Sequence, residues 1–335
     1  MKYVNSYQIF IVYSSILILL VVLGLALSFG SYKVTFIDYL YSDMSKVQES
    51  VFTKIRFPRV LLSAFVGASL AISGACLQGL FRNPLADPGL IGVSAGAALG
   101  ATSFIVLGSI FIQGSVTNPY LLPLSSICGS AFVISALFFI TRGFGKEGIT
   151  YLLLAGIAVN AFAGVGIGIL TYVSDDSELR GLTFWTMGSF GGATISMIGP
   201  AIFFIIFSFI WIIKEARKLD ILQLGESEAY RLGIDIKKLR FSVIVSSAII
   251  VGISVSLSGM IGFVGLVIPH LARILGGVNH SFLLPSSALM GAILMVLADL
   301  FARTMIKPAE LPVGLITSAI GSPFFLWIIF RIRNS

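Results

Sequence analysis

Residues 60–81 read VLLSAFVGASLAISGACLQGLF, 22 consecutive positions without an acidic or basic side chain. A helix needs about 20 apolar residues to cross the hydrocarbon core of a bilayer, so this run is long enough for one crossing. Charge-free runs of the same kind recur on both sides of it along almost the whole chain. The sequence therefore predicts a bundle of membrane-spanning helices.

The composition excludes a water-soluble globule. Of the 335 residues, 57% are hydrophobic and 11% are charged, whereas soluble domains average about 45–50% and about 25%. The mean hydropathy of +1.00 agrees with this. We predict an all-α integral membrane protein with one transmembrane domain, residues 1–335, and ten helices. The predicted spans are residues 9–29, 60–81, 90–112, 120–141, 149–173, 193–213, 241–259, 261–275, 282–305 and 312–332.

Basic residues outnumber acidic residues, 22 to 15, which gives a net charge of +7. In membrane proteins such an excess is typical of cytoplasmic loops, so it does not indicate nucleic-acid binding. An even number of spans puts both termini on one side, and most basic residues fall in the connections on that side. We therefore predict that both termini face the cytoplasm and that the protein crosses the cytoplasmic (inner) membrane several times. Residues 9–29 lack a cleavage site after them and are interpreted as a retained span.

Two connections between spans are long. Residues 214–240 carry seven basic and five acidic side chains among 27 residues, and their pattern predicts two short helices separated by a glycine. Such a segment is typical of a docking surface, although a merely solvated loop would have the same composition. On the opposite side, residues 45–53 predict a helix that lies on the membrane surface.

The motifs of an enzyme are missing from the sequence. The phosphate-loop pattern G-x-x-x-x-G-K-[ST] does not occur, so any ATP must be hydrolysed by another chain. We interpret His270 and His280 as interfacial residues rather than metal ligands. No charged residue lies at the centre of a span, which argues against an ion-coupled secondary carrier, the alternative from a different class. Asp299 and Arg303 lie one turn apart near the end of a span and are expected to pair.

Small residues recur at helical spacing in several spans. In lipid, this spacing lets helices approach closely, so tight packing is the first interpretation. A second interpretation is that the glycines near residue 166 line a passage for a bulky solute, and both can hold in different states. The residues concerned are Gly67, Ala68, Gly74, Gly96, Gly100, Gly164, Gly166, Gly168, Gly188 and Gly192.

Residues 81–89, FRNPLADPG, hold two prolines and a glycine, which predict a rigid turn at the membrane face. With its surroundings, this turn resembles the permease subunits of ATP-driven importers for iron-siderophores, haem and cobalamin, the FecCD type. The resemblance extends over essentially the whole chain in separate motifs. They are RFPR at 56–59, GACLQ at 74–78, NPLADPGLIG at 83–92, GFVGLVIPH at 262–270, ELPVG at 310–314 and GSP at 321–323.

The resemblance implies a type II ABC importer permease fold, in which ten-helix subunits pair as a homodimer around a central path. It also implies two ATPase subunits on the cytoplasmic side, which would bind ATP and Mg²⁺, and a substrate-binding protein outside. This chain itself would have no catalytic residue, metal or cofactor. The residues implied for ATPase coupling are Glu228, Ala229 and Gly233, within the cytoplasmic segment 214–240. Those implied for binding-protein docking are Arg56, Arg59 and Arg303. The implied cytoplasmic gate is Asn83, Pro84, Leu85, Ile149 and Thr150. The implied translocation path is Asn160, Gly164, Gly168 and Arg180.

Several of these roles have a second interpretation. The outer arginines can contact lipid phosphates, Asn160 can hydrogen-bond a neighbouring helix, and Arg180 can balance the acidic residues at 175–178. Residues 152–161, 170–180 and 184–189 look most similar to the haem branch. Haem is a flat apolar macrocycle with two carboxylates, and an arginine can bind a carboxylate through two hydrogen bonds. The prediction is thus a permease for haem, with an iron-siderophore and then cobalamin as the alternative cargo.

Overall fold

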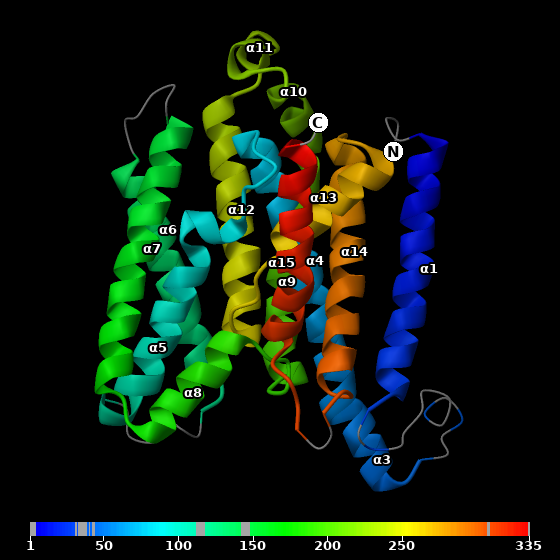
Figure 1. The fold of residues 1–335 in the computed structure, drawn as a ribbon, viewed down its shortest axis with the longest axis vertical. Helices are drawn as coiled ribbons and strands as arrows, with labels where there is room; N and C mark the ends of the chain where they lie inside the picture. Colours follow the sequence, from blue (N-terminus) through cyan, green and yellow to red (C-terminus); the bar gives the residue numbers. More distant parts are fainter. Residues whose placement is uncertain are drawn as a thin grey trace.

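The structure is a computed structural model that describes residues 5–30, 32, 39, 41, 44–111, 118–141, 148–306 and 309–333. Every regular element within these ranges is a helix, and the long helices run side by side in one bundle (Figure 1). The predicted all-α fold class is therefore confirmed for this part of the chain.

Long helices follow the apolar runs of the sequence, and short helices occupy the connections. The long helices are α1 (Ser6–Ser28), α4 (Phe57–Phe81), α5 (Val93–Phe111), α6 (Leu121–Ile140), α7 (Gly148–Val173), α9 (Ile195–Lys214), α12 (Ile236–Ser258), α13 (Val264–Gly276), α14 (His280–Ala302) and α15 (Val313–Arg333). The shorter ones are α3 (Lys46–Ser50), the π-helix η1 (Val51–Arg56), the 3₁₀-helix η2 (Pro88–Ile91), α8 (Asp176–Met187), α10 (Ala216–Leu222) and α11 (Glu226–Arg231).

The helix α4 forms the core of the bundle. It packs against α14, α12 and α13, and 83% of its apolar window is buried. In contrast, α1 and α7 bury 22% and 17% of theirs, and they lie at opposite sides of the bundle (Figure 1). These two helices therefore leave most of their apolar side chains for lipid or for another chain.

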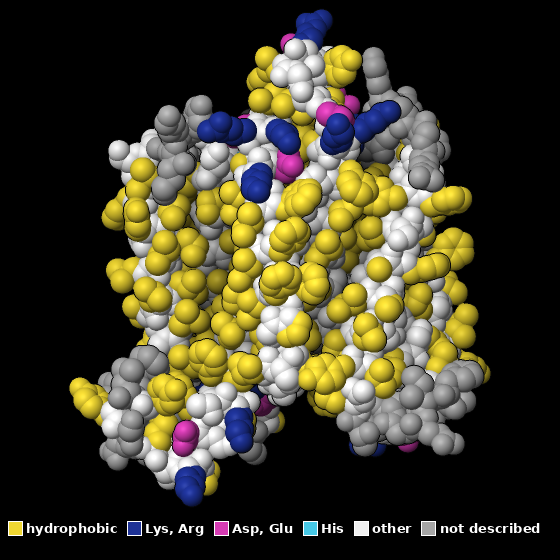
Figure 2. All heavy atoms as spheres, turned by 180° about the vertical axis from the view of Figure 1, so that it is seen from behind, with side chains coloured by type: hydrophobic (Ala, Val, Ile, Leu, Met, Phe, Trp, Pro, Cys, Tyr) yellow, Lys and Arg dark blue, Asp and Glu magenta, His cyan; other side chains and the backbone are white. Residues whose placement is uncertain are grey.

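The two ends of the bundle differ. One end carries α10 and α11, together with the N-terminal end of α1 and the C-terminal end of α15, and the other carries α3 and α8 (Figure 1). We call these the α10–α11 end and the α3–α8 end. Hydrophobic side chains dominate the middle of the surface, and charged side chains gather at both ends (Figure 2). This distribution is what a bilayer around the middle of the bundle requires.

Seven helices in the described ranges are long and apolar enough to cross a membrane. The apolar windows of α5, α13 and α15 are shorter, namely Val93–Gly108, Val264–Gly276 and Val313–Trp327. Each predicted span therefore corresponds to a helix. At about 1.5 Å per residue, a helix as short as α13 covers roughly 20 Å of a hydrocarbon core about 30 Å thick. The seven long helices are candidate crossings, and a total of ten crossings stays a prediction.

Two connections differ from the sequence prediction. The helix α8 was missed, although Asp175 accepts hydrogen bonds from the N–H groups of Ser177 and Glu178, and Glu178 accepts one from the N–H of Asp175. This reciprocal pattern is a recognisable helix-start signal. The helix predicted at 45–53 exists as α3 and η1. It continues directly into α4 as one helical stretch, Lys46–Phe81, and its position on the membrane surface stays a prediction.

The predicted tight packing of small residues is confirmed in the core. A Cβ atom added at Gly67 or Gly74 of α4 would overlap backbone atoms of α14 or α13. A Cβ atom added at Gly96 or Gly100 of α5 would overlap backbone atoms of α6. Glycine is needed at these positions because the helices touch backbone to backbone.

Candidate functional site

The turn that follows α4 is held by its own polar side chains. Arg82 ends α4 in a left-handed conformation, with φ of +50°. The side-chain oxygen of Asn83 accepts a hydrogen bond from the N–H of Leu85 at 2.9 Å, and Asp87 accepts one from the N–H of Gly89 at 2.8 Å. Burial raises the pKa of the Asp87 carboxyl, and the hydrogen bond from Gly89 opposes this rise. The predicted rigid turn is therefore present.

The helix α7 packs closely against this turn. The side-chain amide of Asn160 donates a hydrogen bond to the carbonyl oxygen of Gly89 at 3.0 Å. One turn earlier on the same face, a Cβ atom added at Gly156 would overlap the carbonyl oxygen of Leu90. The hydrogen bond from Asn160 to a neighbouring element is therefore confirmed, and its role in lining a path stays a prediction.

The predicted gate residues fall into two groups. Asn83, Pro84 and Leu85 are exposed on the turn, Leu85 at 40%. Ile149 and Thr150 belong to the first turn of α7, but their side chains lie outside the described part of the chain. The structure thus brings the turn against α7 through Asn160, and the gate itself stays a prediction.

Further along α7, one and two turns after Asn160, the helix is not packed against the described part of the chain. No atom of that part lies within 4 Å of a Cβ atom added at Gly164 or Gly168. Phe162 and Tyr172 nearby are 79% and 89% exposed. Unlike the glycines of α4 and α5, these two glycines make no close helix contact in the chain, so this face is open to a second copy, a solute or lipid.

The last predicted path residue, Arg180, lies on α8 at the α3–α8 end. Its side chain is exposed, and Nε donates to the backbone carbonyl oxygen of Asp176 at 3.3 Å. The guanidinium group thus bonds to its own helix, and a role towards cargo stays a prediction.

A charged cluster lies at the α3–α8 end. Arg59 Nε lies 2.9 Å from Asp299 Oδ1, and Arg59 Nη1 lies 2.7 Å from Glu310 Oε2. Arg303 Nε lies 3.5 Å from Asp299 Oδ2, which confirms the pair predicted from the sequence. The side chains of Arg59, Asp299 and Arg303 are 7%, 2% and 5% exposed, and that of Glu310 is 47% exposed. We call these four residues the outer cluster.

The third predicted docking arginine is buried nearby. Arg56 Nη1 donates to the carbonyl oxygens of Leu27 and Ser28 at 2.9 and 3.0 Å. Arg303 in turn donates to the carbonyl oxygen of Ala26. These bonds tie the end of α1 to η1 and α14.

From the sequence, Arg56, Arg59 and Arg303 were expected to be basic residues that face outwards. The structure brings all three to one end of the bundle, but it turns their guanidinium groups inwards onto Asp299 and backbone carbonyls. Their description as free outward cations is therefore corrected. Docking of a binding protein at this end stays a prediction.

The segment 214–240 contains the two predicted short helices, α10 and α11. They are separated at Gly225, whose φ is +117°. Within α11, Ala229 is fully buried, and Glu228 forms an exposed ion pair with Arg231 at 3.2 Å. Gly233 ends this helix with φ of +82°, a left-handed conformation that favours glycine.

Two long-range side-chain contacts, a hydrogen bond and an ion pair, fix this segment to the bundle. His280 Nδ1 lies 2.6 Å from Asp220 Oδ1, which also accepts the backbone N–H of His280 at 2.8 Å. Arg240 Nη2 lies 2.5 Å from Glu226 Oε1. Neither contact was predicted from the sequence, because no spacing rule links residues this far apart. His280, interpreted as interfacial, is 3% exposed and joins α14 to α10.

The tip of the α10–α11 end has an apolar surface. Leu224, Tyr230 and Leu232 are 68%, 76% and 60% exposed. Apolar side chains that gather at a charged end, outside the apolar middle band, are typical of an interface with another protein.

Comparisons with known proteins agree with this geometry. The FecCD transport family matches residues 16–331. The hemin transport system permease protein of Yersinia pestis is 44% identical over 324 residues, which are 95% of both chains. The vitamin B12 import system permease protein of Vibrio cholerae is 38% identical over 300 residues, which are 88% of this chain and 87% of the relative.

Among solved structures, a metal-chelate type ABC transporter in an inward-facing conformation matches with a TM-score of 0.85 and 34% sequence identity. The match covers 96% of this chain and 99% of the other. Family, relatives and fold therefore agree over nearly the whole length. The chain belongs to the FecCD transport family and is a permease of the ABC importer type.

Proposed function

We propose that the chain is the permease of an importer that carries haem into the cell. It works as a homodimer, each copy one permease domain with ten crossings, in the cytoplasmic membrane. The observation that supports haem as cargo is the 44% identity to a hemin permease over 95% of both chains. The segments in α7 and α8 that look most similar to the haem branch of the family agree with it. ATP and Mg²⁺ belong to separate ATPase subunits, so this chain has a transport role rather than a catalytic one.

The ATPase docks at the α10–α11 end, which then faces the cytoplasm. The exposed apolar side chains Leu224, Tyr230 and Leu232 support this assignment, because they offer a contact surface beyond the apolar band. The hydrogen bond of Asp220 with His280 and the ion pair of Glu226 with Arg240 brace the segment against α14 and α12. A rigid link of this kind can transmit a movement of α11 to the helices of the bundle. Glu228, Ala229 and Gly233 shape the docking helix.

Transport uses the turn after α4 and the open face of α7. The turn with Asn83, Pro84 and Leu85 closes the inner end of the path together with the start of α7. Asn160 supports this by joining α7 to the turn, so the two move as one body. Two copies face each other so that Gly164 and Gly168 border the path, and the empty space beside both glycines supports this placement.

The substrate-binding protein docks at the α3–α8 end. The buried arginines support a positioning role, because Arg56 and Arg303 hold the end of α1 while Arg59 holds Glu310. Their contribution is the shape of the docking surface rather than free positive charge. Arg180 is exposed on α8 at the same end, and its guanidinium group binds the carboxylates of haem as haem enters the path.

Cobalamin is the second candidate cargo. The vitamin B12 import permease of Vibrio cholerae is 38% identical, and permeases for such chelates share one scaffold, so the scaffold alone does not select the cargo. An iron-siderophore is the third candidate.

The test is uptake into proteoliposomes that contain the permease, its ATPase and its binding protein. We expect ATP-dependent uptake of haem. We also expect the binding protein to stimulate ATP hydrolysis when it is incubated with haem, but not when it is incubated with cobalamin or a ferric siderophore. Stimulation by one of the other two would assign that cargo instead. Uptake by the permease alone would mean that the chain is a secondary carrier.

Gly233→Arg should uncouple ATP hydrolysis from transport. The large side chain would project from the end of α11, where no atom of the described residues lies within 4 Å of an added Cβ atom, so the bundle should stay folded while docking fails. Left-handed backbone costs a non-glycine residue about 1–2 kcal/mol. Gly233→Asn is the matched control, because Asn tolerates this conformation and is small. We expect transport per hydrolysed ATP to fall at least about tenfold for Arg, the equivalent of 1.4 kcal/mol, and little for Asn. Normal transport by Gly233→Arg would disprove the coupling role.

A further inference from the structure

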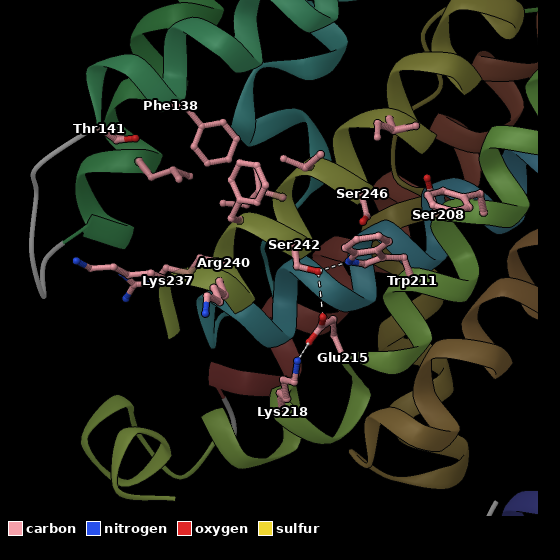
Figure 3. Close-up of a pocket in the computed structure, with 17 residues that line it drawn as sticks. Phe138, Thr141, Ser208, Trp211, Glu215, Lys218, Lys237, Arg240, Ser242 and Ser246 are labelled. Carbon is pink, nitrogen blue, oxygen red and sulfur yellow. Dashed lines mark hydrogen bonds and ion pairs between the residues drawn. The ribbon is translucent and has the colours of Figure 1, made fainter. Parts of the chain in front are cut away.

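A large groove lies beside the bundle core, towards the α10–α11 end, among α6, α9 and α12 (Figure 3). Its volume is about 940 Å³, near the upper limit of typical small-molecule pockets, about 1,000 Å³. Among the side chains that the structure describes, none of those implied for gate, path, coupling or docking lines it. The groove shares Arg240 with the contacts that brace α11 against the bundle.

One part of the groove is basic. It is lined by four cationic side chains and a single carboxylate, that of Glu215. Three cations, Lys237, Lys238 and Arg240, come from the first turns of α12, and Lys218 comes from α10. They lie where the apolar helices end, which is the depth of lipid headgroups in a bilayer.

The positive charge of this part is only partly balanced. Lys218 pairs with Glu215 at 2.7 Å, and Lys238, 87% exposed, pairs with Asp235 at 3.3 Å. Lys237 has no ion pair within the described ranges. Arg240 is bound through Nη2 to Glu226, but its Nε is buried without a hydrogen-bond partner in the described part of the chain.

The rest of the groove is mainly apolar and aromatic, with a few hydroxyl side chains among the apolar ones. Phe138 of α6 and Phe241 of α12 lie with ring centroids 5.3 Å apart, and Phe207 and Trp211 of α9 with centroids 6.0 Å apart. Ile249 extends this surface along α12 towards the middle of the bundle.

Hydrogen bonds connect the apolar and charged parts. Trp211 Nε1 donates to Ser242 Oγ at 2.6 Å, and Ser242 donates to Glu215 at 3.1 Å, next to Lys218 (Figure 3). A tryptophan with its ring among apolar groups and its N–H in a polar network is typical of a membrane interface.

We propose that this groove binds one anionic phospholipid from the leaflet at the α10–α11 end. Its phosphate lies among Lys237, Lys238 and Arg240, and an acyl chain follows Phe241, Trp211 and the apolar surface beyond them. Charge complementarity selects an anionic lipid, because a zwitterionic headgroup brings no net charge to balance the cations. The long apolar part selects a lipid over a free anion, which would leave that surface empty.

The site can be tested by fluorescence quenching of Trp211. The chain has three tryptophans, so Trp185→Phe with Trp327→Phe leaves Trp211 as the sole emitter. The full chain is placed in nanodiscs of phosphatidylcholine and phosphatidylglycerol, with bromine on the acyl chains of one lipid at a time. At equal mole fractions, we expect brominated phosphatidylglycerol to reach Trp211 with about fivefold preference, as an electrostatic gain of about one lysine implies.

Two variants decide whether the groove causes this preference. Lys237→Gln with Lys238→Gln should abolish it, whereas Lys214→Gln with Arg217→Gln, which removes two charges from the same end outside the groove, should leave it. Equal quenching by both lipids would disprove the site, as would equal loss in the two double variants. Displacement of the lipid by inorganic phosphate would show a simple anion site instead. If the tryptophan-reduced chain misfolds, retention of phosphatidylglycerol over phosphatidylcholine after detergent extraction of the original chain, measured by mass spectrometry, gives the same decision.

Discussion

Gly74→Val is expected to destabilise the permease strongly. A side chain at this position would overlap the backbone of Gly265 in α13, and a backbone carbonyl cannot turn aside as a side chain can. Overpacking a core costs about 1–3 kcal/mol and occasionally more. Because α4 is the central helix, α13 would have to move away from it, so we place the loss at the upper end of that range. The measurement is the melting temperature of the purified chain in detergent, together with its yield from membranes.

Gly24→Val is the matched control for this substitution. Gly24 also lies inside a long apolar helix, α1, but no atom of the described part of the chain lies within 4 Å of an added Cβ atom. The same change of residue should therefore leave the melting temperature almost unchanged. Similar losses in both variants would mean that valine harms any apolar helix of this chain, and that close contact between α4 and α13 is not the cause.

The contrast between glycines shows what the sequence could predict about packing. Spacing alone predicts close helix contact at Gly67 and Gly74 and equally at Gly164 and Gly168. The structure confirms close helix contact at the first pair, whereas the second pair contacts no other helix in the described part of the chain. Spacing identifies a smooth helix face, but it does not tell which neighbour meets that face, because the neighbour lies far away in the sequence.

The helices themselves were largely predictable. Long runs without charge mark them, since an ionised side chain in the hydrocarbon core is costly. The segment 214–240 was also predicted in outline, because glycines at positions such as Gly225 interrupt helices. In contrast, α8 was missed because it is short and carries Asp176, Glu178 and Arg180, so a search for apolar runs passes over it.

The sequence located the outer arginines but misjudged their surroundings. A cation just beyond an apolar run is usually exposed at the interface, and that expectation was applied to Arg59. Its partner Asp299 is 240 positions away along the chain. No local pattern links the two, so only the packing of α4 against α14 reveals that the guanidinium group is buried.

Asp299→Asn is expected to destabilise the permease strongly through the outer cluster. The amide has nearly the shape of the carboxylate but no charge, so Arg59 and Arg303 would remain buried as cations without their shared counter-ion. Removing one partner from a buried ion pair costs about 3–5 kcal/mol. The melting temperature of the purified chain should fall accordingly.

Glu310→Gln is the control for the general effect of removing an acidic partner of Arg59. The carboxylate of Glu310 is 47% exposed, and an exposed ion pair contributes about 0–1 kcal/mol, so this variant should melt close to the original chain.

A double variant then separates the effect of buried charge from that of lost hydrogen bonds. Combining Asp299→Asn with Arg303→Met removes one of the two cations that lose Asp299 as counter-ion, so the combined loss should be clearly smaller than the sum of the two single losses. Strict additivity, or a loss for Glu310→Gln as large as that for Asp299→Asn, would mean that the cluster does not act as a buried counter-ion network, and the arginines would again be candidates for binding an acidic partner directly.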